Sequence, residues 1–181
     1  MRLIFGKGKV SSIISRKGDV VLSRSDCDIT SERQVKSVLR EFNPDVIINC
    51  AAKTNLENCQ EDKMSSFASN TSGVLNLVNA CSENGAKLVH ISSGCLFDGN
   101  QEIASERSAP TPAVWYTWTK TWADQIIENF GYENFLILRP RQLISKTPHP
   151  TNMITKFSKM SRIPAIEEDN SLTCIEDFKE M

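Results

Sequence analysis

Residues 1–11 read MRLIFGKGKVS, a stretch that contains an expected strand, a turn and the start of a helix. Arg2–Phe5 is a short apolar run of the kind found in buried strands, and it meets a turn that contains Gly6 and Gly8. A short helix is predicted from this turn to about Arg16. This order is typical of the first unit of a sheet whose strands run parallel.

The alternation of strands and helices continues along the chain. Further strands are predicted at Asp19–Leu22, Asp45–Asn49, Lys87–Ile91 and Asn134–Arg139. One helix follows the capping box of Ser31 and Gln34, one carries Val74, Leu77, Val78 and Cys81, and one carries the stripe Trp115, Trp118, Trp122 and Ile126. The tryptophan stripe is interpreted as core or dimer packing. The pattern predicts an α/β protein with a doubly wound parallel sheet and helices on both faces.

The composition is that of an ordinary globular chain, with 181 residues of which 40% are apolar and 24% charged. The 21 basic and 22 acidic residues give a net charge of −1, which offers no general attraction to nucleic acid or to an anionic membrane. No apolar run approaches the ~20 residues that span a bilayer, and the N-terminal apolar run soon stops at a glycine. We therefore expect a cytoplasmic protein that binds neither nucleic acid nor membrane.

The cysteines agree with a cytoplasmic location and argue against a metal site. Cys27, Cys50, Cys59, Cys81, Cys95 and Cys174 include no Cys-x-x-Cys pair, and the chain has only two histidines, His90 and His149. We expect no metal, and most of these cysteines are interpreted as small buried apolar residues.

The charge pattern changes after residue 139. Six Lys or Arg residues and no Asp or Glu occur from Arg139 to Arg162, whereas Glu167–Glu180 contains six acidic residues and one lysine. The basic stretch is either a solvated surface or a wall that binds a diphosphate, since Lys and Arg pair well with phosphate oxygens. The tail shows no clear period and is expected to be an incomplete element or a loosely packed end.

The turn after the first strand is a candidate cofactor site, because ligands of doubly wound sheets bind beyond the carboxyl ends of the strands. Gly6, Gly8 and Ser11 form a turn in which glycines let the backbone approach a pyrophosphate. A Gly-x-Gly turn alone is common by chance, but its place between a strand and a helix favours a dinucleotide site.

The loop after the second strand bears on the choice of cofactor. Ser23 and Arg24 stand where an acidic residue would favour NAD, and a hydroxyl beside an arginine suits the 2′-phosphate of NADP. If Arg24 is only an exposed loop residue, NADH remains an alternative. Asp28 and Ile29 are expected to line the adenine pocket.

Candidate catalytic residues follow the later strands. Ala51 and Ala52 are small enough for a cofactor to lie against the backbone, and Ser93 follows another strand. Tyr116 and Lys120 are four residues apart, hence on one helix face. A Tyr-x-x-x-Lys pair alone is weak evidence for a catalytic site. The evidence is stronger here because a cofactor turn and a serine at the end of a strand precede the pair in the expected order. An ammonium group at Lys120, together with the positive nicotinamide ring of the oxidised cofactor, is predicted to lower the pKa of Tyr116. The tyrosine would donate a proton to a carbonyl oxygen held by Ser93.

Together these residues resemble the extended short-chain dehydrogenase/reductases, through Gly6-x-Gly8, Ala51-Ala52, Ser93, Tyr116-x-x-x-Lys120 and Leu138-Arg139-Pro140. The run HISSGCLFDG at 90–99 is similar to the dTDP-4-dehydrorhamnose reductases. A closer similarity is to the bifunctional nucleotide-rhamnose synthases (3,5-epimerase/4-reductases), through Gly94-Cys95, Leu138-Arg139-Pro140-Arg141 and Asn152-Met153-Ile154-Thr155-Lys156. The resemblance covers nearly the whole chain and implies a Rossmann-like fold.

The resemblance implies an enzyme that reduces a nucleotide-linked 4-keto-6-deoxy sugar with NADPH, turning dTDP- or UDP-4-dehydrorhamnose into the L-rhamnose nucleotide. The resemblance implies that Ser93, Tyr116 and Lys120 are catalytic residues. It also implies that Lys120 binds the nicotinamide ribose. It assigns 3,5-epimerisation to Cys95 and Lys156, for which a structural thiol and a surface lysine are the alternatives. It adds Pro140 to the cofactor residues and suggests a substrate set of Asn55, Ser93, Gly94 and Asn152.

The resemblance also implies an NAD(P)-binding domain at 1–145 and the incomplete start of a substrate-binding region at 146–181, because the family continues for a further segment. The family commonly pairs through helices, so a homodimer is a further expectation. The alternative function is an NAD(P)-binding regulatory module or fragment with little or no turnover.

Overall fold

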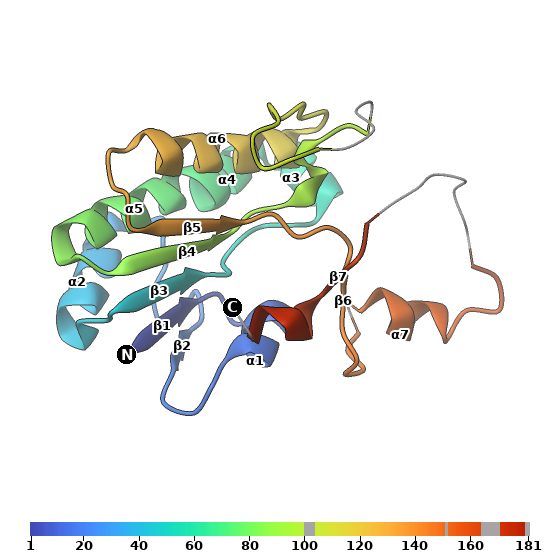
Figure 1. Cartoon of the computed structure of the whole chain (residues 1–181), viewed down its shortest axis with the longest axis horizontal. Coiled ribbons are helices and arrows are strands. Elements are labelled where there is room, and N and C mark those ends of the chain that lie inside the picture. The colour runs from blue at the N-terminus through green and yellow to red at the C-terminus, as the bar shows by residue number, and fades with distance from the viewer. Residues whose placement is uncertain (100–103, 151, 164–170, 180–181) are drawn as a thin grey trace.

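The computed structural model describes residues 1–99, 104–150, 152–163 and 171–179. A single five-stranded parallel sheet has the order β2-β1-β3-β4-β5 (Figure 1). Its strands are β1 (Arg2–Phe5), β2 (Val20–Leu22), β3 (Val46–Asn49), β4 (Lys87–Ile91) and β5 (Phe135–Leu138). The predicted parallel sheet with flanking helices is confirmed, and each strand lies within one residue of its expected bounds.

The longer helices cover one face of the sheet. They are α2 (Glu32–Phe42), α5 (Gly73–Asn84) and α6 (Trp115–Asn129); α3 (Leu56–Glu61), α4 (Lys63–Phe67) and a π-helical turn at Ala68–Ser72 connect β3 to α5 (Figure 1). Alternate strand residues face opposite ways. Leu3 and Phe5 therefore pack under these helices, whereas Ile4 belongs to a second core on the other face, beside α1 (Lys9–Ile14).

Local capping residues mark the ends of the predicted helices. The Ser31 hydroxyl accepts a hydrogen bond from the Gln34 backbone N–H at the start of α2, as the capping box predicts. Asn43 follows the helix with φ 42°, and Gly85 follows α5 with φ 82°. Left-handed residues of these types commonly end helices, so these two ends are readable from sequence.

The C-terminal segment returns to the sheet. β6 (Leu143–Ile144) pairs with β7 (Thr173–Cys174), and a short 3₁₀-helix follows at Ile175–Lys179. The Ile175 side chain is fully buried in the second core with Ile4, Ile14 and Ile48. The expectation of a loosely packed end is therefore wrong at Ile175, because this non-local isoleucine, not a periodic run, anchors the segment. The tail residues 164–170 and 180–181 lie outside the described residues.

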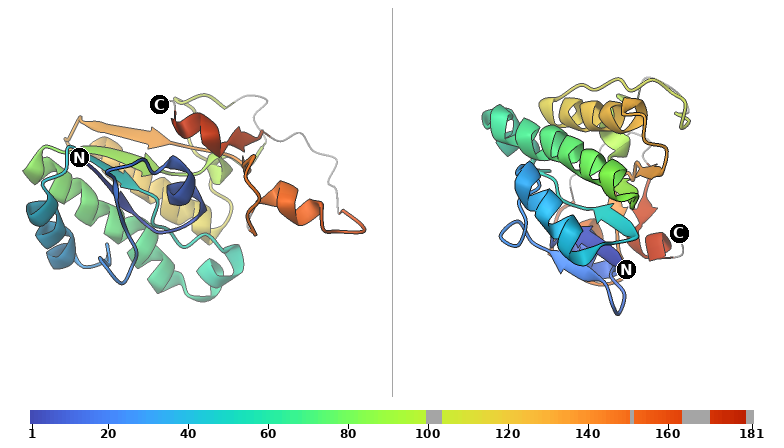
Figure 2. Two further views of the ribbon diagram at one scale, coloured as in Figure 1. Left: turned by 90° about the horizontal axis from the view of Figure 1, so that it is seen from below. Right: turned by 90° about the vertical axis from the view of Figure 1, so that its left-hand side faces the viewer.

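The basic stretch from residue 139 is neither one solvated surface nor one phosphate-binding wall. Arg139 Nε pairs with Asp124 at 2.8 Å and Arg139 Nη2 pairs with Glu128 at 3.0 Å, so this guanidinium ties β5 to α6. Lys156 lies on α7 (Met153–Phe157), which projects away from the sheet beyond its carboxyl edge (Figure 2). The two ends of the stretch have different roles.

The tryptophan stripe of α6 packs as an aromatic cluster. Trp122 contacts Phe67, Trp115 and Trp118 at ring-centroid separations of 5.7, 5.5 and 5.6 Å. An apolar groove beside it runs between α5 and α6, and pairing of two copies there stays a prediction. In the part of the chain that the structure describes, no helix has the length and apolar character that crossing a membrane requires.

Candidate active site

A cavity of about 1000 Å³ lies at the carboxyl edge of the sheet. It opens where β1 has β2 on one side and β3 on the other, the point at which such sheets bind ligands. The predicted residues that line it are Gly6, Gly8, Ser11, Ser23, Arg24, Asp28, Ile29, Ala51, Ala52, Ser93, Cys95, Tyr116, Lys120, Pro140 and Lys156. The topology therefore brings segments that are far apart in sequence to one site.

The glycine turn after β1 is shaped by a close backbone approach. Gly6 has φ +93°, and a Cβ there would lie 2.5 Å from the Ala51 backbone nitrogen. Ser11 is buried and closes the turn. Its hydroxyl accepts from the Gly8 N–H at 2.8 Å and donates to the Gly8 carbonyl at 2.9 Å.

The cavity wall beside this turn is cationic. Lys7, Lys9, Arg24 and Lys156 line it. Burial and then the nearby charge of Lys156 lower the pKa of Lys9. Both lysines line the cavity. Arg24 Nε pairs with Asp28 at 2.9 Å, and both side chains line the cavity at the end of β2. This wall suits phosphate groups, which attract Lys and Arg.

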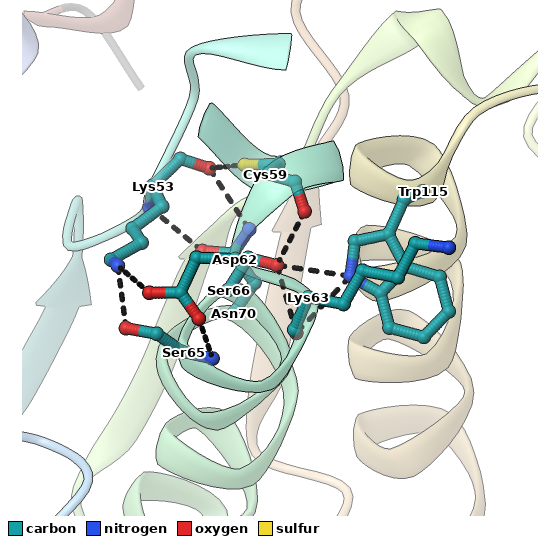
Figure 3. Close-up of polar contacts among 8 residues, drawn as sticks. All are labelled: Lys53, Cys59, Asp62, Lys63, Ser65, Ser66, Asn70 and Trp115. Atoms are coloured by element: carbon teal, nitrogen blue, oxygen red, sulfur yellow. Dashed lines mark hydrogen bonds and ion pairs between the residues drawn. The ribbon is translucent and has the colours of Figure 1, made fainter. Parts of the chain in front are cut away.

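The loop after β3 is held against the cavity by a polar network (Figure 3). The Asn70 amide accepts from the Lys53 backbone N–H at 2.8 Å and donates to the Lys53 carbonyl at 2.9 Å. The Lys53 ammonium group contacts Asp62 at 3.6 Å and also the Ser65 hydroxyl. Asn70 lies in the π-helical turn, a distortion common near functional sites.

The same network extends to the start of α6. Trp115 Nε1 donates to the Ser66 hydroxyl at 2.9 Å, and that hydroxyl in turn donates to the Cys59 carbonyl at 3.2 Å. The helices that follow β3 are thereby tied to the helix that carries Tyr116 and Lys120.

Ser93, Tyr116 and Lys120 converge on the cavity and are 6%, 9% and 1% exposed. Burial raises the pKa of Tyr116 to about 12, and a hydrogen bond with Ser93 acts in the opposite direction. Burial lowers the pKa of Lys120 to about 8. In the cofactor-free protein the pKa of Tyr116 is therefore raised, because desolvation outweighs the other effects. The lowering predicted for the complex with the oxidised cofactor stays a prediction.

Asn49 and His90 are two buried polar residues that the sequence reasoning missed. They are register partners on β3 and β4, and the face they share is covered by α6. His90 Nδ1 lies 3.1 Å from Asn49 Nδ2, and His90 Nε2 lies 3.0 Å from Lys120 Nζ. Lys120 Nζ also donates to the Ile91 carbonyl at 2.8 Å. The available signal was a polar residue near the end of each of two buried strands.

Three of the expected substrate residues lie outside the cavity lining. Asn55 caps α3 by accepting from the Asn58 backbone N–H at 2.8 Å. Gly94 packs against the chain at Arg141, where a Cβ would approach within 3.0 Å. Asn152 is buried and donates to the Ser145 carbonyl at 2.7 Å. Contact of these three residues with substrate stays a prediction.

The expected epimerase pair lines the cavity from separate elements. Cys95 lies on the 3₁₀ turn Gly94–Leu96, and its backbone N–H donates to the Ser93 hydroxyl at 3.1 Å. Lys156 is exposed on α7, near Lys9. Cys95 thus stands beside the end of β4, whereas Lys156 stands beside the turn that follows β1.

The cavity fits a dinucleotide. Gly6 allows the turn to sit against Ala51, while open space surrounds Gly8, where a Cβ would meet no atom within 4 Å. The cationic wall lies beside that opening. The volume is at the upper end of the range typical of ligand sites. The backbone of the glycine turn, the cationic wall and the cavity volume are therefore those that a bound NAD(P) requires.

The fold and cavity define the class: a Rossmann-like protein with a dinucleotide-type cavity at the carboxyl edge of its sheet. The chain belongs to the RmlD substrate binding domain family, whose model matches residues 7–177.

Curated and solved relatives agree with this membership. The chain is 25% identical over 193 residues to the bifunctional dTDP-4-dehydrorhamnose 3,5-epimerase/dTDP-4-dehydrorhamnose reductase of Arabidopsis thaliana, covering 97% of this chain and 62% of that protein. A dTDP-4-dehydrorhamnose reductase from Clostridium acetobutylicum superposes with a TM-score of 0.86 at 26% identity, over 99% and 67% of the two chains.

A second solved relative was crystallised with NADP. It is the dTDP-4-dehydrorhamnose reductase of Bacillus anthracis, with a TM-score of 0.81 and 25% identity over 87% of this chain and 58% of that one. The chain thus spans about three fifths of the length of the plant and Bacillus relatives.

Proposed function

We propose that this chain contains the cofactor-binding and catalytic part of an NADPH-dependent reductase acting on a nucleotide-linked 4-keto-6-deoxy sugar. The observation that carries the proposal is the meeting of Ser93, Tyr116 and Lys120 at one cavity whose other end is a glycine turn. The activities named for the relatives supply the substrate class, 4-dehydrorhamnose linked to dTDP or UDP. Residues 1–145 would bind the cofactor, and 146–181 would begin the substrate region.

The proposed chemistry divides between three side chains. When bound, NADPH would supply the hydride that the carbonyl carbon at position 4 of the sugar accepts. Ser93 donates a hydrogen bond to the carbonyl oxygen and holds it beside Tyr116. The Tyr116 phenol then gives its proton to that oxygen as negative charge develops. Lys120, anchored on the Ile91 carbonyl, orients the cofactor ribose and the phenol.

The proposed activity is tested by following NADPH absorbance with UDP- or dTDP-4-keto-6-deoxyglucose and its 3,5-epimer as substrates. We expect loss of NADPH that depends on the keto sugar. The alternative is an NAD(P)-binding module without turnover, and it rests on the partial coverage of the relatives. Folded protein that binds NADPH but consumes none with either substrate would favour that alternative.

Arg24 is proposed to read the 2′-phosphate that distinguishes NADPH from NADH. Its side chain is exposed, lines the cavity and is held by Asp28. Arg24→Ala should weaken NADPH binding about 10–100-fold, the value of one charged hydrogen bond, and leave NADH affinity nearly unchanged. Fluorescence titration with both cofactors measures this. Arg40→Ala, which removes the same charge from the exposed end of α2, is the matched control; equal losses for both cofactors would refute the assignment.

The 3,5-epimerase activity is proposed to use Cys95 as the base, since protons beside a keto group are acidic and a thiolate can remove one. Cys95→Ser should block solvent deuterium incorporation at C3 and C5 of the keto sugar while NADPH still binds. Cys174→Ser, a change of another partly buried thiol outside the cavity lining, is the control. Unchanged exchange, measured by mass spectrometry, would eliminate Cys95 as the base.

A further inference from the structure

The turn that carries Ser93 is held from behind by the chain that follows β5. The Gly94 backbone N–H donates to the Pro140 carbonyl at 2.8 Å, and Arg141 Nη1 donates to the Gly94 carbonyl at 3.2 Å. Glycine at position 94 permits this approach, because a Cβ there would lie 3.0 Å from the Arg141 Cβ. The Arg141 backbone N–H in turn donates to the Thr173 hydroxyl at 3.1 Å, which anchors the arginine on β7.

One peptide group connects the Arg141 guanidinium to the Ser93 side chain. The peptide between Gly94 and Cys95 receives the hydrogen bond of Arg141 Nη1 at its carbonyl oxygen. The N–H of the same peptide donates to Ser93 Oγ at 3.1 Å. Hydrogen bonds in such a chain polarise one another, and a charged donor forms the stronger kind of bond. Arg141 therefore makes the Cys95 N–H a stronger donor to the serine oxygen.

The direction of the Ser93 hydroxyl proton follows from this bond. A hydroxyl has one proton to donate, and an oxygen that accepts from a backbone N–H directs that proton elsewhere. Burial raises the pKa of Tyr116, and its hydrogen bond with Ser93 opposes that rise. A bond that opposes the rise favours the phenolate, so the serine is the donor in it. Both side chains line the cavity, and the serine proton is therefore available to a carbonyl oxygen there.

The charge of Arg141 is not cancelled by a neighbour. Its sequence neighbour Arg139 is paired with Asp124 and Glu128, whereas no carboxylate in the described part of the chain forms an ion pair with Arg141. Its Nε is buried and has no hydrogen-bond partner among these residues. A half-buried charge without an ion pair costs free energy. The guanidinium is better explained by its effect on the Gly94 carbonyl than by a gain in stability.

We propose that Arg141 is a positioning residue for the reduction, which acts through the peptide between Gly94 and Cys95 to fix the Ser93 hydroxyl as a donor to the sugar carbonyl. The arginine lies outside the cavity lining and touches neither cofactor nor substrate. Its effect on the rate rests on the proposed function, whereas the chain of hydrogen bonds rests on geometry alone.

A double-mutant cycle tests the coupling between Arg141 and Ser93. Arg141→Met removes the guanidinium and should lower kcat about 10-fold, near the lower value of a hydrogen bond to a charged group. Ser93→Ala should lower kcat about 10²-fold, as for one donor to a developing oxyanion. Adding Arg141→Met to Ser93→Ala should change kcat by less than about 2-fold, because the hydroxyl through which the arginine acts is absent. Losses that multiply would overturn the proposal.

Two further variants control the cycle. Arg141→Lys keeps a charged donor and should retain more of the rate than Arg141→Met; equal losses would contradict a role for the charge. Arg33→Met removes an exposed arginine from α2 and should leave kcat unchanged. Fluorescence titration should give the wild-type affinity for NADPH in every variant. If Arg141→Met does not fold, Arg141→Gln, which also removes the charge, replaces it in the cycle.

The hydrogen-bond chain is tested without turnover by ¹H–¹⁵N NMR of the full chain labelled at cysteine. The sequence has six cysteines, and the variant Cys95→Ser identifies the Cys95 amide signal by its loss. Without the guanidinium the bond from this amide to Ser93 Oγ should weaken. We therefore expect its proton to move upfield in Arg141→Met and to move less in Arg141→Lys. An unchanged or downfield signal in the folded Arg141→Met protein would overturn the proposal.

The two proposals fail separately. If no keto sugar is reduced but the Cys95 amide proton moves upfield in Arg141→Met, the proposed function is wrong and the chain of hydrogen bonds stands. If reduction occurs and the losses of Arg141→Met and Ser93→Ala multiply, the proposed function stands and Arg141 is not a positioning residue.

Discussion

Tyr116→Phe should lower the rate of keto-sugar reduction roughly 10²–10⁴-fold, the usual contribution of a positioned general acid. Phenylalanine keeps the ring that lines the cavity and removes only the hydroxyl that donates the proton. NADPH affinity should therefore change little, so that the loss falls on kcat. Steady-state kinetics, with cofactor binding measured by fluorescence, gives both values.

The other tyrosine provides a matched control. Tyr132 donates its hydroxyl proton to the Ala86 carbonyl at 2.6 Å and does not line the cavity. Tyr132→Phe should lower the free energy of unfolding by about 1 kcal/mol through the lost hydrogen bond and leave the reduction rate unchanged. A Tyr116→Phe protein with the wild-type rate would remove Tyr116 from the mechanism.

Gly6→Ala should lower the free energy of unfolding by about 2–4 kcal/mol, from overpacking and left-handed backbone strain together. The residue has φ +93°, and the added Cβ would lie 2.5 Å from the Ala51 backbone nitrogen. The three nearest atoms are all backbone atoms of Cys50 and Ala51, so no flexible side chain can move away. Urea unfolding measures the loss, and NADPH binding should weaken because the turn must shift.

Gly8→Ala is the contrast within the same turn. A Cβ at Gly8 meets nothing within 4 Å, and its backbone is extended, with φ −152°. Its stability should stay within about 0.5 kcal/mol of the wild type. If the two variants unfold at the same urea concentration, the close approach of Gly6 to Ala51 does not constrain the turn.

Much of the fold was predictable because its signals are local. The strands are short apolar runs, and residues such as Ser31 and Gly85 mark helix ends through their own backbone chemistry. The C-terminal segment was not predictable in this way. Ile175 belongs to a core formed with β1, α1 and β3, and no pattern near residue 175 encodes that contact.

The location of the site was predictable for a topological reason. Residues that follow parallel strands meet at one edge, so Gly6, Ala51 and Ser93 were expected to lie together. The directions of side chains inside the sheet were not predictable, because they depend on register. Asn49 and His90 meet only because Ile48 pairs with Val89 and sets the next residues opposite each other.

The pKa shifts of the site residues could also not be predicted from the sequence. The spacing of Tyr116 and Lys120 indicates one helix face but carries no information about burial. Burial raises the pKa of Tyr116 to about 12 and lowers that of Lys120 to about 8, so each shift disfavours the charged form of its group. An estimate from spacing alone assumes a charged lysine and reaches the opposite sign for the tyrosine.

The most direct test of the central claim is transfer of deuterium from NADPH deuterated at the reactive face of nicotinamide C4 to the keto sugar. Mass spectrometry and NMR of the product locate the label. We predict one deuterium at sugar C4 with the wild type and almost none with Tyr116→Phe. Folded wild-type protein that binds NADPH, yet leaves C4 unlabelled with both the keto sugar and its epimer, would contradict the account.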